Sequence, residues 1–377
     1  MITFKLLKQA SAIFHGKVII QSSTWKNSIF LRYGISTQRM VNKRISINDI
    51  AKNLKIAKST VSLIINGKGD ERRISKELQK KVLDYVKEVG FHPHHLAKSL
   101  ATGRSNSIGL VVEDISDSFF GPIALMIETL AKSYGYRVMY SSTLGDTDTA
   151  NEIIDFFRRS QLDGYIIAPT KGMEKVVMEM IGERIPVVLF DRDPIEGVGF
   201  VGTNNKQATI EACTHLYERG FKKIGFVTST STQSQMNDRL LGYQEVMSDR
   251  GIKSKVVYIP FNDSKKEKKN HIANFLEQNQ QLDAVIFATN YLCIAGLEVI
   301  NNLDKRRTTD LGIVSFDDHE AFNLVSPTIT AIRQPLEELS KHIIELLIKK
   351  IQKPNNEEKT HVILPSVIKL RQSSEKR

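Results

Sequence analysis

The chain has 377 residues, enough for two or more domains with a large core, and its 41% hydrophobic and 25% charged residues are ordinary for a soluble globular protein. The net charge of +11 is unevenly distributed, because residues 1–106 hold 20 Lys and Arg against 6 Asp and Glu and the remainder has a net charge of −3. This segregation indicates a phosphate-rich partner for the N-terminal part. No apolar run reaches about 18 residues, so we expect no membrane-spanning helix and no membrane partner.

Residues 1–42 match no pattern found elsewhere in the chain. Their basic and apolar start could indicate a signal peptide, but Lys5, Lys8, His15 and Lys17 interrupt the apolar stretch and no A-x-A cleavage site follows. We therefore expect a disordered N-terminal extension over residues 1–42.

Residues 43–93 have the spacing of short amphipathic helices. Ser46 can cap a first helix whose apolar residues lie at i, i+3, i+4 and i+7: Ile47, Ile50, Ala51 and Leu54. After a break at Lys55-Ile56, a second helix has Val61, Ile64 and Ile65 on its apolar face. The pattern is typical of a helix-turn-helix unit, which lays its second helix in the DNA major groove. The alternative is a helical hairpin within a globular core.

A third helix is expected from near Ser75, ending before Gly90 and Pro93. The residues expected to face inward are Leu78, Val82, Leu83, Val86 and Val89.

The segment from Asp49 to Gly67 reads D-I-A-x-x-L-x-I-A-x-S-T-V-S-x-x-I-N-G and resembles the DNA-binding headpiece of LacI-type transcriptional repressors. The likeness covers roughly Lys43 to Arg371, with the motifs in the family's order. It implies an all-α helix-turn-helix headpiece followed by an α/β domain like the type I periplasmic binding proteins. Because the family pattern begins just after Met40, we hypothesise that translation starts there; the intact mass of natively expressed protein would test this.

The headpiece departs from the family at three positions. Lys55 replaces a turn glycine, Ala57 replaces the serine that opens the second helix, and Leu63 replaces a frequent base-reading arginine. Leu63 could touch a thymine methyl group but cannot pair with guanine. We expect base contacts from Lys58, Ser59, Ser62 and Leu63, with Ser46, Thr60 and Asn66 closer to phosphates or to internal turns.

Residues 94–106 are too few to form a stable helix alone, although Leu96 and Leu100 are four residues apart. The resemblance implies a hinge that becomes helical on operator DNA, with Leu100 wedged between base pairs and Lys98 as a further DNA contact. The alternative is an interdomain linker whose leucine packs on the core. Histidines 92, 94 and 95 could suggest a metal site, but we expect none.

From Ser107 onward, short apolar runs alternate with amphipathic stretches, which predicts parallel sheets covered on both faces. The runs are Ile108–Val112, Arg137–Ser141, Gly164–Ala168, Pro186–Phe190, Lys223–Thr228, Val256–Ile259, Ala284–Ala288 and Gly312–Phe316. The resemblance implies that residues 107–371 form two Rossmann-like subdomains for effector binding and dimerisation, crossed several times by the chain, before a tail at 372–377.

Ligands bind beyond the carboxyl ends of such strands, so the residues that follow the runs are candidate ligand contacts. Matching positions in the family imply five effector-binding residues: Phe119, Phe120, Arg239, Asn290 and Asp317. Arg192, which follows the predicted strand Pro186–Phe190, is placed to bind the effector in the same way. Guanidinium, carboxylate and amide groups around an aromatic platform suit a polyhydroxylated ligand. Salt bridges that hold the cleft are the alternative for the charged residues, and core packing is the alternative for the two phenylalanines.

We therefore expect a sequence-specific, cytoplasmic transcriptional regulator that binds double-stranded operator DNA as a homodimer. Its control would come from a small-molecule effector, a sugar or sugar derivative, with no other cofactor and no metal. Cys213 and Cys293 match no metal spacing and are expected to be reduced, partly buried thiols. No phosphate loop, H-E-x-x-H or G-x-S-x-G motif occurs, so we expect no enzyme. The alternative class is a sugar-binding receptor or transport component without DNA binding.

Leu100→Ala tests the expected wedge. The variant should bind its specific duplex more weakly, because the apolar insertion that supports the bent DNA is lost, while nonspecific, salt-dependent binding stays nearly intact. Fluorescence anisotropy titrations on both kinds of DNA measure this, and equal losses on both would contradict the wedge role.

Overall fold

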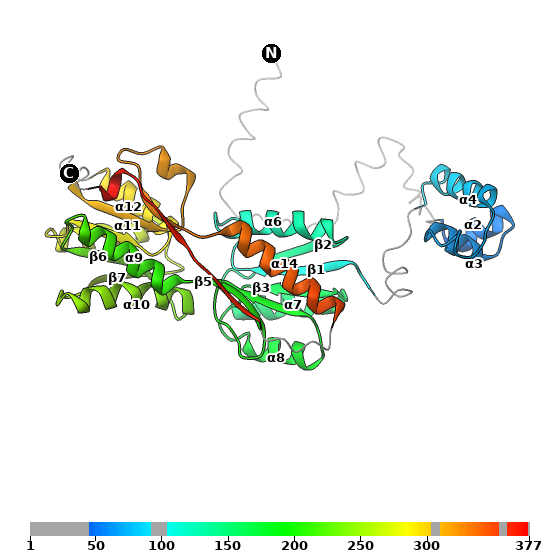
Figure 1. Cartoon of the computed structure of the whole chain (residues 1–377), viewed down its shortest axis with the longest axis horizontal. Helices are drawn as coiled ribbons and strands as arrows, with labels where there is room; N and C mark the ends of the chain where they lie inside the picture. Colours follow the sequence, from blue (N-terminus) through cyan, green and yellow to red (C-terminus); the bar gives the residue numbers. More distant parts are fainter. Residues whose placement is uncertain (1–44, 92–103, 303–309, 354–359, 376–377) are drawn as a thin grey trace, which may run out of the picture. The chain divides into compact units, whose positions relative to one another are not determined.

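The computed structural model describes residues 45–91, 104–302, 310–353 and 360–375 (Figure 1). The chain divides into two compact units, Met1–Pro93 and His94–Arg377, which are treated separately below. The expected extension at 1–42, most of the expected hinge, and the candidate DNA contacts Lys98 and Leu100 lie outside the described residues.

The N-terminal unit contains the three expected helices: α2 (Ile47–Leu54), α3 (Lys58–Ile65) and α4 (Lys76–Glu88). Ser46 caps α2 through a capping box, in which its side chain accepts from the Asp49 backbone N–H while the Asp49 carboxylate accepts from the Ser46 N–H. The helix ends at Lys55, whose φ of 55° lies in the left-handed region that favours glycine. This turn separates α2 from α3 at the position where the family has a glycine.

A small core joins the three helices and contains Ile50, Ala51, Val61, Ile64, Val82 and Phe91. The expectation for Leu83 was wrong, because 48% of this residue is exposed. Leu83 follows the buried Val82 by one residue, and one residue turns a helix by about 100°, which carries the side chain off the inward face. Tyr85 packs against the core instead, and its hydroxyl accepts from Asn53 Nδ2 at 2.7 Å.

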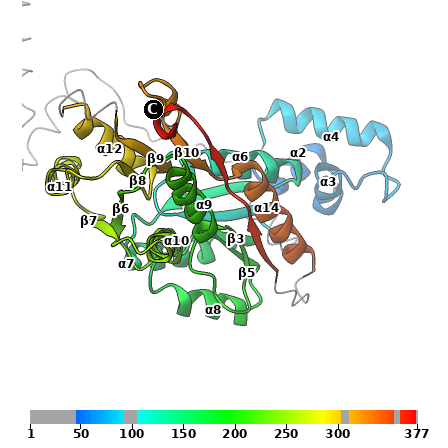
Figure 2. The ribbon, with the colours of Figure 1, turned by 60° about the vertical axis from the view of Figure 1, so that its left-hand side comes forward.

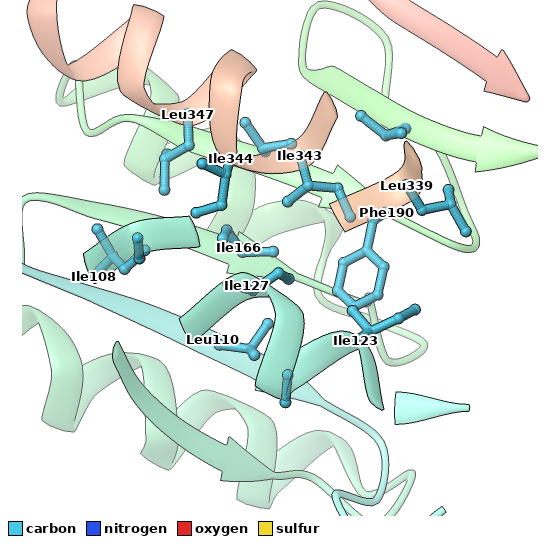
Figure 3. Close-up of a cluster of buried hydrophobic side chains, with 14 of the residues drawn as sticks. Ile108, Leu110, Ile123, Ile127, Ile166, Phe190, Leu339, Ile343, Ile344 and Leu347 are labelled. Carbon is cyan, nitrogen blue, oxygen red and sulfur yellow. The ribbon is translucent and has the colours of Figure 1, made fainter. Parts of the chain in front are cut away.

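In the second unit, the first lobe is built on a six-stranded sheet of order β11-β5-β4-β3-β1-β2, in which all pairs are parallel. Its strands are β1 (Ser107–Val112), β2 (Arg137–Ser142), β3 (Gly164–Ile167), β4 (Val187–Phe190), β5 (Gly199–Thr203) and β11 (His361–Leu364). Helices α6 (Phe120–Ser133) and α14 (Leu336–Gln352) cover one face, where Ile127, Ile166 and Ile344 belong to the same buried cluster (Figure 3). Helices α7 (Thr147–Arg159) and α8 (Glu174–Gly182) cover the other face.

The second lobe repeats this plan with sheet order β12-β10-β9-β8-β6-β7. Its strands are β6 (Ile224–Thr230), β7 (Lys255–Pro260), β8 (Ala284–Phe287), β9 (Gly312–Phe316), β10 (Thr330–Arg333) and β12 (Val367–Lys369). Helices α9 (Asn205–Glu218) and α10 (Ser234–Asp249) pack on one face, and α11 (Lys265–Gln278) and α12 (Asn290–Ile300) pack on the other. The β10–β12 pair is antiparallel, so the expectation of purely parallel sheets was wrong at this edge.

The chain passes between the lobes three times, which confirms the expected crossings (Figure 2). The crossings join β5 to α9, β10 to α14 and β11 to β12. Two of them are bonded directly, since Asn204 Oδ1 accepts from the Ser366 N–H at 2.8 Å and the Asn204 N–H donates to Leu364. Adjacent crossings that bond to one another are suited to act as a hinge between two rigid lobes.

Both cysteines are fully buried rather than partly buried, and burial raises the pKa of each thiol, that of Cys293 to about 12. Within the described ranges, no helix is long and apolar enough to cross a bilayer. The expected tail at 372–377 begins with a 3₁₀ turn, Gln372–Ser374, in which the Ser373 N–H donates to Thr328 O at 2.9 Å.

The left-handed turn at Lys55 predicts that Lys55→Gly stabilises the N-terminal unit by roughly 0.5–1 kcal/mol, because glycine adopts this φ without a clash at Cβ. Amide hydrogen exchange of α2 and α3 in the full chain measures the change. Lys52→Gly, a matched substitution inside α2, should instead destabilise by roughly 0.5–1 kcal/mol. The prediction fails if both variants exchange faster than the wild type.

Candidate functional site

The candidate DNA-binding face belongs to α3. Lys58 and Ser59 are exposed, while Thr60, Ser62 and Leu63 are partly exposed. Ala57 precedes the helix without a side-chain cap, as its missing hydroxyl predicts. The helix therefore begins with free backbone N–H groups, a favourable position for a phosphate.

Two of the candidate DNA contacts bond within their own unit. Ser46 belongs to the capping box of α2, and Asn66 Nδ2 donates to Ser62 O at 2.8 Å. Phosphates or internal turns were the two expected neighbours of these residues, and the observed bonds lie at internal turns. The outward face of α3 is the main candidate reader of base edges.

A cavity of about 950 Å³ lies between the two lobes of the second unit, at the carboxyl ends of their strands. All six candidate effector-binding residues line it: Phe119, Phe120, Arg192, Arg239, Asn290 and Asp317. The sheet topology thus brings together residues separated by up to about 200 positions in the chain.

Arg239 is the most heavily constrained of these side chains. It is only 3% exposed, and its guanidinium carbon lies 3.6 Å from the centroid of the Phe316 ring. Its Nε donates to Asn205 Oδ1 at 2.8 Å, and its Nη1 donates to the Ala288 carbonyl at 2.8 Å. Nη1 also lies 3.4 Å from Asp317 Oδ2. Stacking and bonding fix the plane of the guanidinium beside the cavity.

Five side chains close a hydrogen-bonded ring that includes Arg239, here called the hinge ring: Arg239, Asn205, Thr203, Gln334 and Asp317. Gln334 Nε2 donates to Asp317 Oδ1 at 2.6 Å, and Thr203 Oγ1 donates to Gln334 Oε1 at 2.8 Å. Thr203 ends β5 and Gln334 follows β10, so the ring joins the cavity to two of the three crossings.

Asp317 has an unusual pKa and an unusual backbone conformation. Burial raises its pKa above the ordinary range, although Arg239 and Gln334 oppose this shift. Its backbone φ of 66° is also left-handed, as are those of Asp191 and Asp193 after β4. Strained aspartates at strand ends are characteristic of binding sites, where the surrounding structure holds them in place.

Arg192 lies on the first-lobe side of the cavity and is 5% exposed. Its Nε donates to Asp191 Oδ2 at 2.8 Å, and its Nη1 donates to Glu113. Burial lowers its pKa, but the two carboxylates outweigh burial and hold the pKa above the ordinary value. The guanidinium therefore stays charged. The salt-bridge alternative for Arg192 is present in the structure, and it leaves the side chain on the cavity wall.

The phenylalanines serve both the core and the cavity wall. Phe119 and Phe120 are 8% and 5% exposed and belong to the core cluster under α14. Phe120 also stands edge-on to Phe190, and Arg192 lies 5.3 Å from its ring centroid. Core packing is therefore established for both, and any contact with a ligand uses only a small part of each ring.

Direct bonds connect the two lobes across the cleft. Asn290 Nδ2 donates to Ser118 Oγ at 2.8 Å, and Gln233 Nε2 donates to Glu113 Oε2 at 3.2 Å. Asp193 and Ser234 exchange two bonds of 2.7 and 2.9 Å. Ser118 supplies one of these bonds and so contributes directly to the contact between the lobes.

Several cavity residues were missed from the sequence. Glu113 and Gln334 line the cavity and bond to Arg192 and to Asp317, and Asn205, a buried residue outside the cavity lining, bonds to Arg239. Asp117 also lines the cavity, and the charge of Asp317 raises the pKa of Asp117, after the larger effect of burial. Glu113 directly follows β1, a position that the strand-end argument could have singled out. Gln334 follows β10, a strand that was not predicted, so no signal pointed to it.

Among the residues that the structure describes, no group of three His, Cys, Asp or Glu side chains could hold a metal ion. Glu113, Asp191 and Asp317 in the cleft pair with arginines, Glu298 pairs with Lys269, and Asp114 and Asp117 accept N–H or O–H bonds. The cavity is thus equipped to bond hydroxyl groups of an organic ligand.

A family model described as "Bacterial regulatory proteins, lacI family" matches residues 46–94 of this chain. A second model, for a periplasmic binding protein-like domain, matches residues 213–374. The chain is 30% identical over 312 residues to a ribose operon repressor of Halalkalibacterium halodurans, covering 82% of this chain and 91% of that protein.

Two solved structures share the fold. A LacI-family transcriptional regulator from Silicibacter pomeroyi has a TM-score of 0.75 at 19% identity, covering 88% of this chain and 99% of that one. The transcriptional regulator CelR in complex with cellobiose has a TM-score of 0.65 at 21% identity, covering 88% and 100%.

The hinge ring predicts that Thr203→Val lowers the free energy of unfolding by about 1–3 kcal/mol, because the substitution leaves the buried Gln334 carbonyl without its donor. Chemical denaturation followed by circular dichroism measures the loss. Thr129→Val is the control, since this exposed threonine donates to the carbonyl of Leu125, one turn earlier in α6, and takes no part in the ring. Equal effects of the two variants would show that the ring bond contributes nothing.

Proposed function

This chain belongs to the LacI family of bacterial regulatory proteins and is a DNA-binding transcriptional regulator, and on that premise we propose that a carbohydrate bound in the interlobe cavity controls its affinity for DNA. The observation that carries this proposal is the buried Arg239, stacked on Phe316 and paired with Asp317 at the cavity wall. Fixed donors and acceptors of this kind pay little entropy when they bond to sugar hydroxyls.

Each candidate residue has a distinct role in the proposed complex. Arg239 and Arg192 donate to ligand oxygens, Asp317 accepts from hydroxyl groups, and Asn290 can do both. Phe119 and Phe120 limit the ligand on its apolar side. No metal, cofactor or catalytic step takes part.

The lobes provide the means of control. A sugar that touches residues of both lobes stabilises the arrangement in which they are bridged, and the three crossings let that arrangement differ between the free and bound states. The effect on DNA equals the difference in sugar affinity between the DNA-competent and DNA-incompetent states.

On the DNA side, we propose that Lys58, Ser59, Ser62 and Leu63 read base edges and that two copies of the chain pair on a pseudo-palindromic operator in the cytoplasm. One three-helix unit is small, and two half-sites supply the affinity that one lacks. The receptor or transport alternative has no use for the helix-turn-helix unit, whose residues fall within the matched LacI region.

The proposal is tested with a selected duplex and a defined sugar panel. Duplexes enriched from random DNA by the full-length protein give the operator, and thermal-shift measurements with D-ribose, D-xylose, cellobiose and fructose 1-phosphate test the effector class. The proposal requires at least one sugar that both raises the melting temperature and changes affinity for the duplex.

Arg239→Ala should abolish the response to that sugar while the protein still binds the duplex, because the three hydrogen bonds of this side chain lie within the second unit. Anisotropy titrations with and without sugar measure both properties. Arg219→Ala, which removes an exposed arginine at the end of α9, should leave both unchanged. A sugar response retained in Arg239→Ala would remove this residue from the site.

A further inference from the structure

The start of the first lobe is fastened at one carboxylate. Asp163 Oδ1 accepts from the Ser105 N–H at 2.7 Å and from the Ser105 hydroxyl at 2.9 Å, and Asp163 Oδ2 accepts from the Asn106 N–H at 2.9 Å. Asp163 also donates its own N–H to Ser107 O at 2.8 Å. A charged acceptor that takes three bonds from two consecutive residues fixes the backbone firmly at this point.

The second lobe has a matching arrangement at Asp283. Asp283 Oδ2 accepts from the Lys222 N–H and Asp283 Oδ1 from the Lys223 N–H, both at 2.8 Å, while the Asp283 N–H donates to Lys223 O at 3.0 Å. Each aspartate directly precedes the strand that pairs with the first strand of its lobe: Asp163 precedes β3, and Asp283 precedes β8. Both carboxylate-bearing residues are partly buried.

These two sets of bonds, here called the clamps at Asp163 and at Asp283, hold different segments of the chain. Asp283 holds the segment that arrives from α9, a helix of the same lobe. Asp163 holds residues 105–106, and the chain before them leads to the DNA-binding unit. Asn106 adds to this fixation, because its φ of 50° is left-handed and its carbonyl accepts from the Arg137 N–H at 2.9 Å.

We infer that Asp163 is a positioning residue for DNA binding: it fixes the point from which the connecting segment leaves the first lobe. The inference rests on the regulator function and on the proposed binding of two copies of the chain to one operator. If the two aspartates only stabilise their lobes, loss of either should have the same effect on DNA binding. Only Asp163 holds the residues at which the chain from the DNA-binding unit enters the first lobe, so only its loss should weaken specific DNA binding.

The physical reason is conformational entropy. Releasing Ser105 and Asn106 leaves the backbones of these two residues to be ordered when the protein binds its specific duplex, and the conformational entropy that this costs lowers the affinity. Nonspecific binding through phosphates makes no demand on this geometry, so it does not share the loss.

The test compares Asp163→Asn with Asp283→Asn in the full-length protein. In each variant an amide N–H₂ group faces backbone N–H donors, so each should lose bonds, and the melting temperature of each should fall by a few degrees. Asp163→Asn should also weaken binding to the selected duplex about tenfold, with less than a twofold change on random DNA. Asp283→Asn should change neither affinity by more than about twofold.

Amide hydrogen exchange shows which of these bonds are lost in each variant. The amides of Ser105 and Asn106 should lose protection in Asp163→Asn and keep it in Asp283→Asn. Equal loss of specific affinity in the two variants would overturn the inference, as would an unchanged affinity in Asp163→Asn with these amides exposed.

If Asp163→Asn does not fold, Ser105→Ala decides, since it removes only the bonds made by the Ser105 hydroxyl. A loss of about two- to threefold on the selected duplex alone supports the inference, and no loss overturns it. Both measurements use DNA without sugar. A protein that binds no sugar of the panel would therefore refute the proposed effector class and leave this result standing.

Discussion

The buried charge of Arg239 is the constraint on which the second unit depends. A guanidinium removed from water must remain bonded, and its partners come from α9, from the end of β8 and from the loop after β9. Through Asp317 and Asn205 the hinge ring extends to Thr203 and Gln334, at two of the crossings. The cavity wall and two of the lobe crossings are therefore one bonded network, and a ligand that competes for Arg239 or Asp317 would change bonds at these crossings as well.

The repeated architecture was accessible from the sequence where apolar runs are long and continuous. All eight predicted strands are present, and the amphipathic spacing placed the three helices of the N-terminal unit. The four strands that were missed are β5, β10, β11 and β12. Their length of three to five residues is not the reason, because β3, β4 and β8 have only four residues each and were predicted. β11 and β12 lie at the sheet edges and are only partly buried. Such edge and crossing strands carry too few apolar residues to stand out, because tertiary contacts rather than local pattern stabilise them.

The sequence predicted which residues line the candidate site, but it did not predict the hydrogen-bond partners of these residues. The rule that ligands lie beyond strand ends placed Arg192, Asn290 and Asp317 on one cavity, because topology alone brings parallel strand ends together. The partners of these residues were not accessible in the same way. Gln334 meets Thr203 across 131 positions of sequence, and an amide has no pattern that reveals which hydroxyl it will find. The exposure of Leu83 was missed because an apolar side chain next to a buried one satisfies the spacing test almost as well.

The two cysteines have a practical consequence for study of the lobes. Both thiols are sealed in the core of the second unit and have raised pKa values, so almost no thiolate is available at neutral pH. The protein therefore provides a silent background for maleimide chemistry. A single cysteine introduced on the surface of each lobe can carry a fluorophore without removal of the native residues, and energy transfer between the dyes then reports lobe movement in solution.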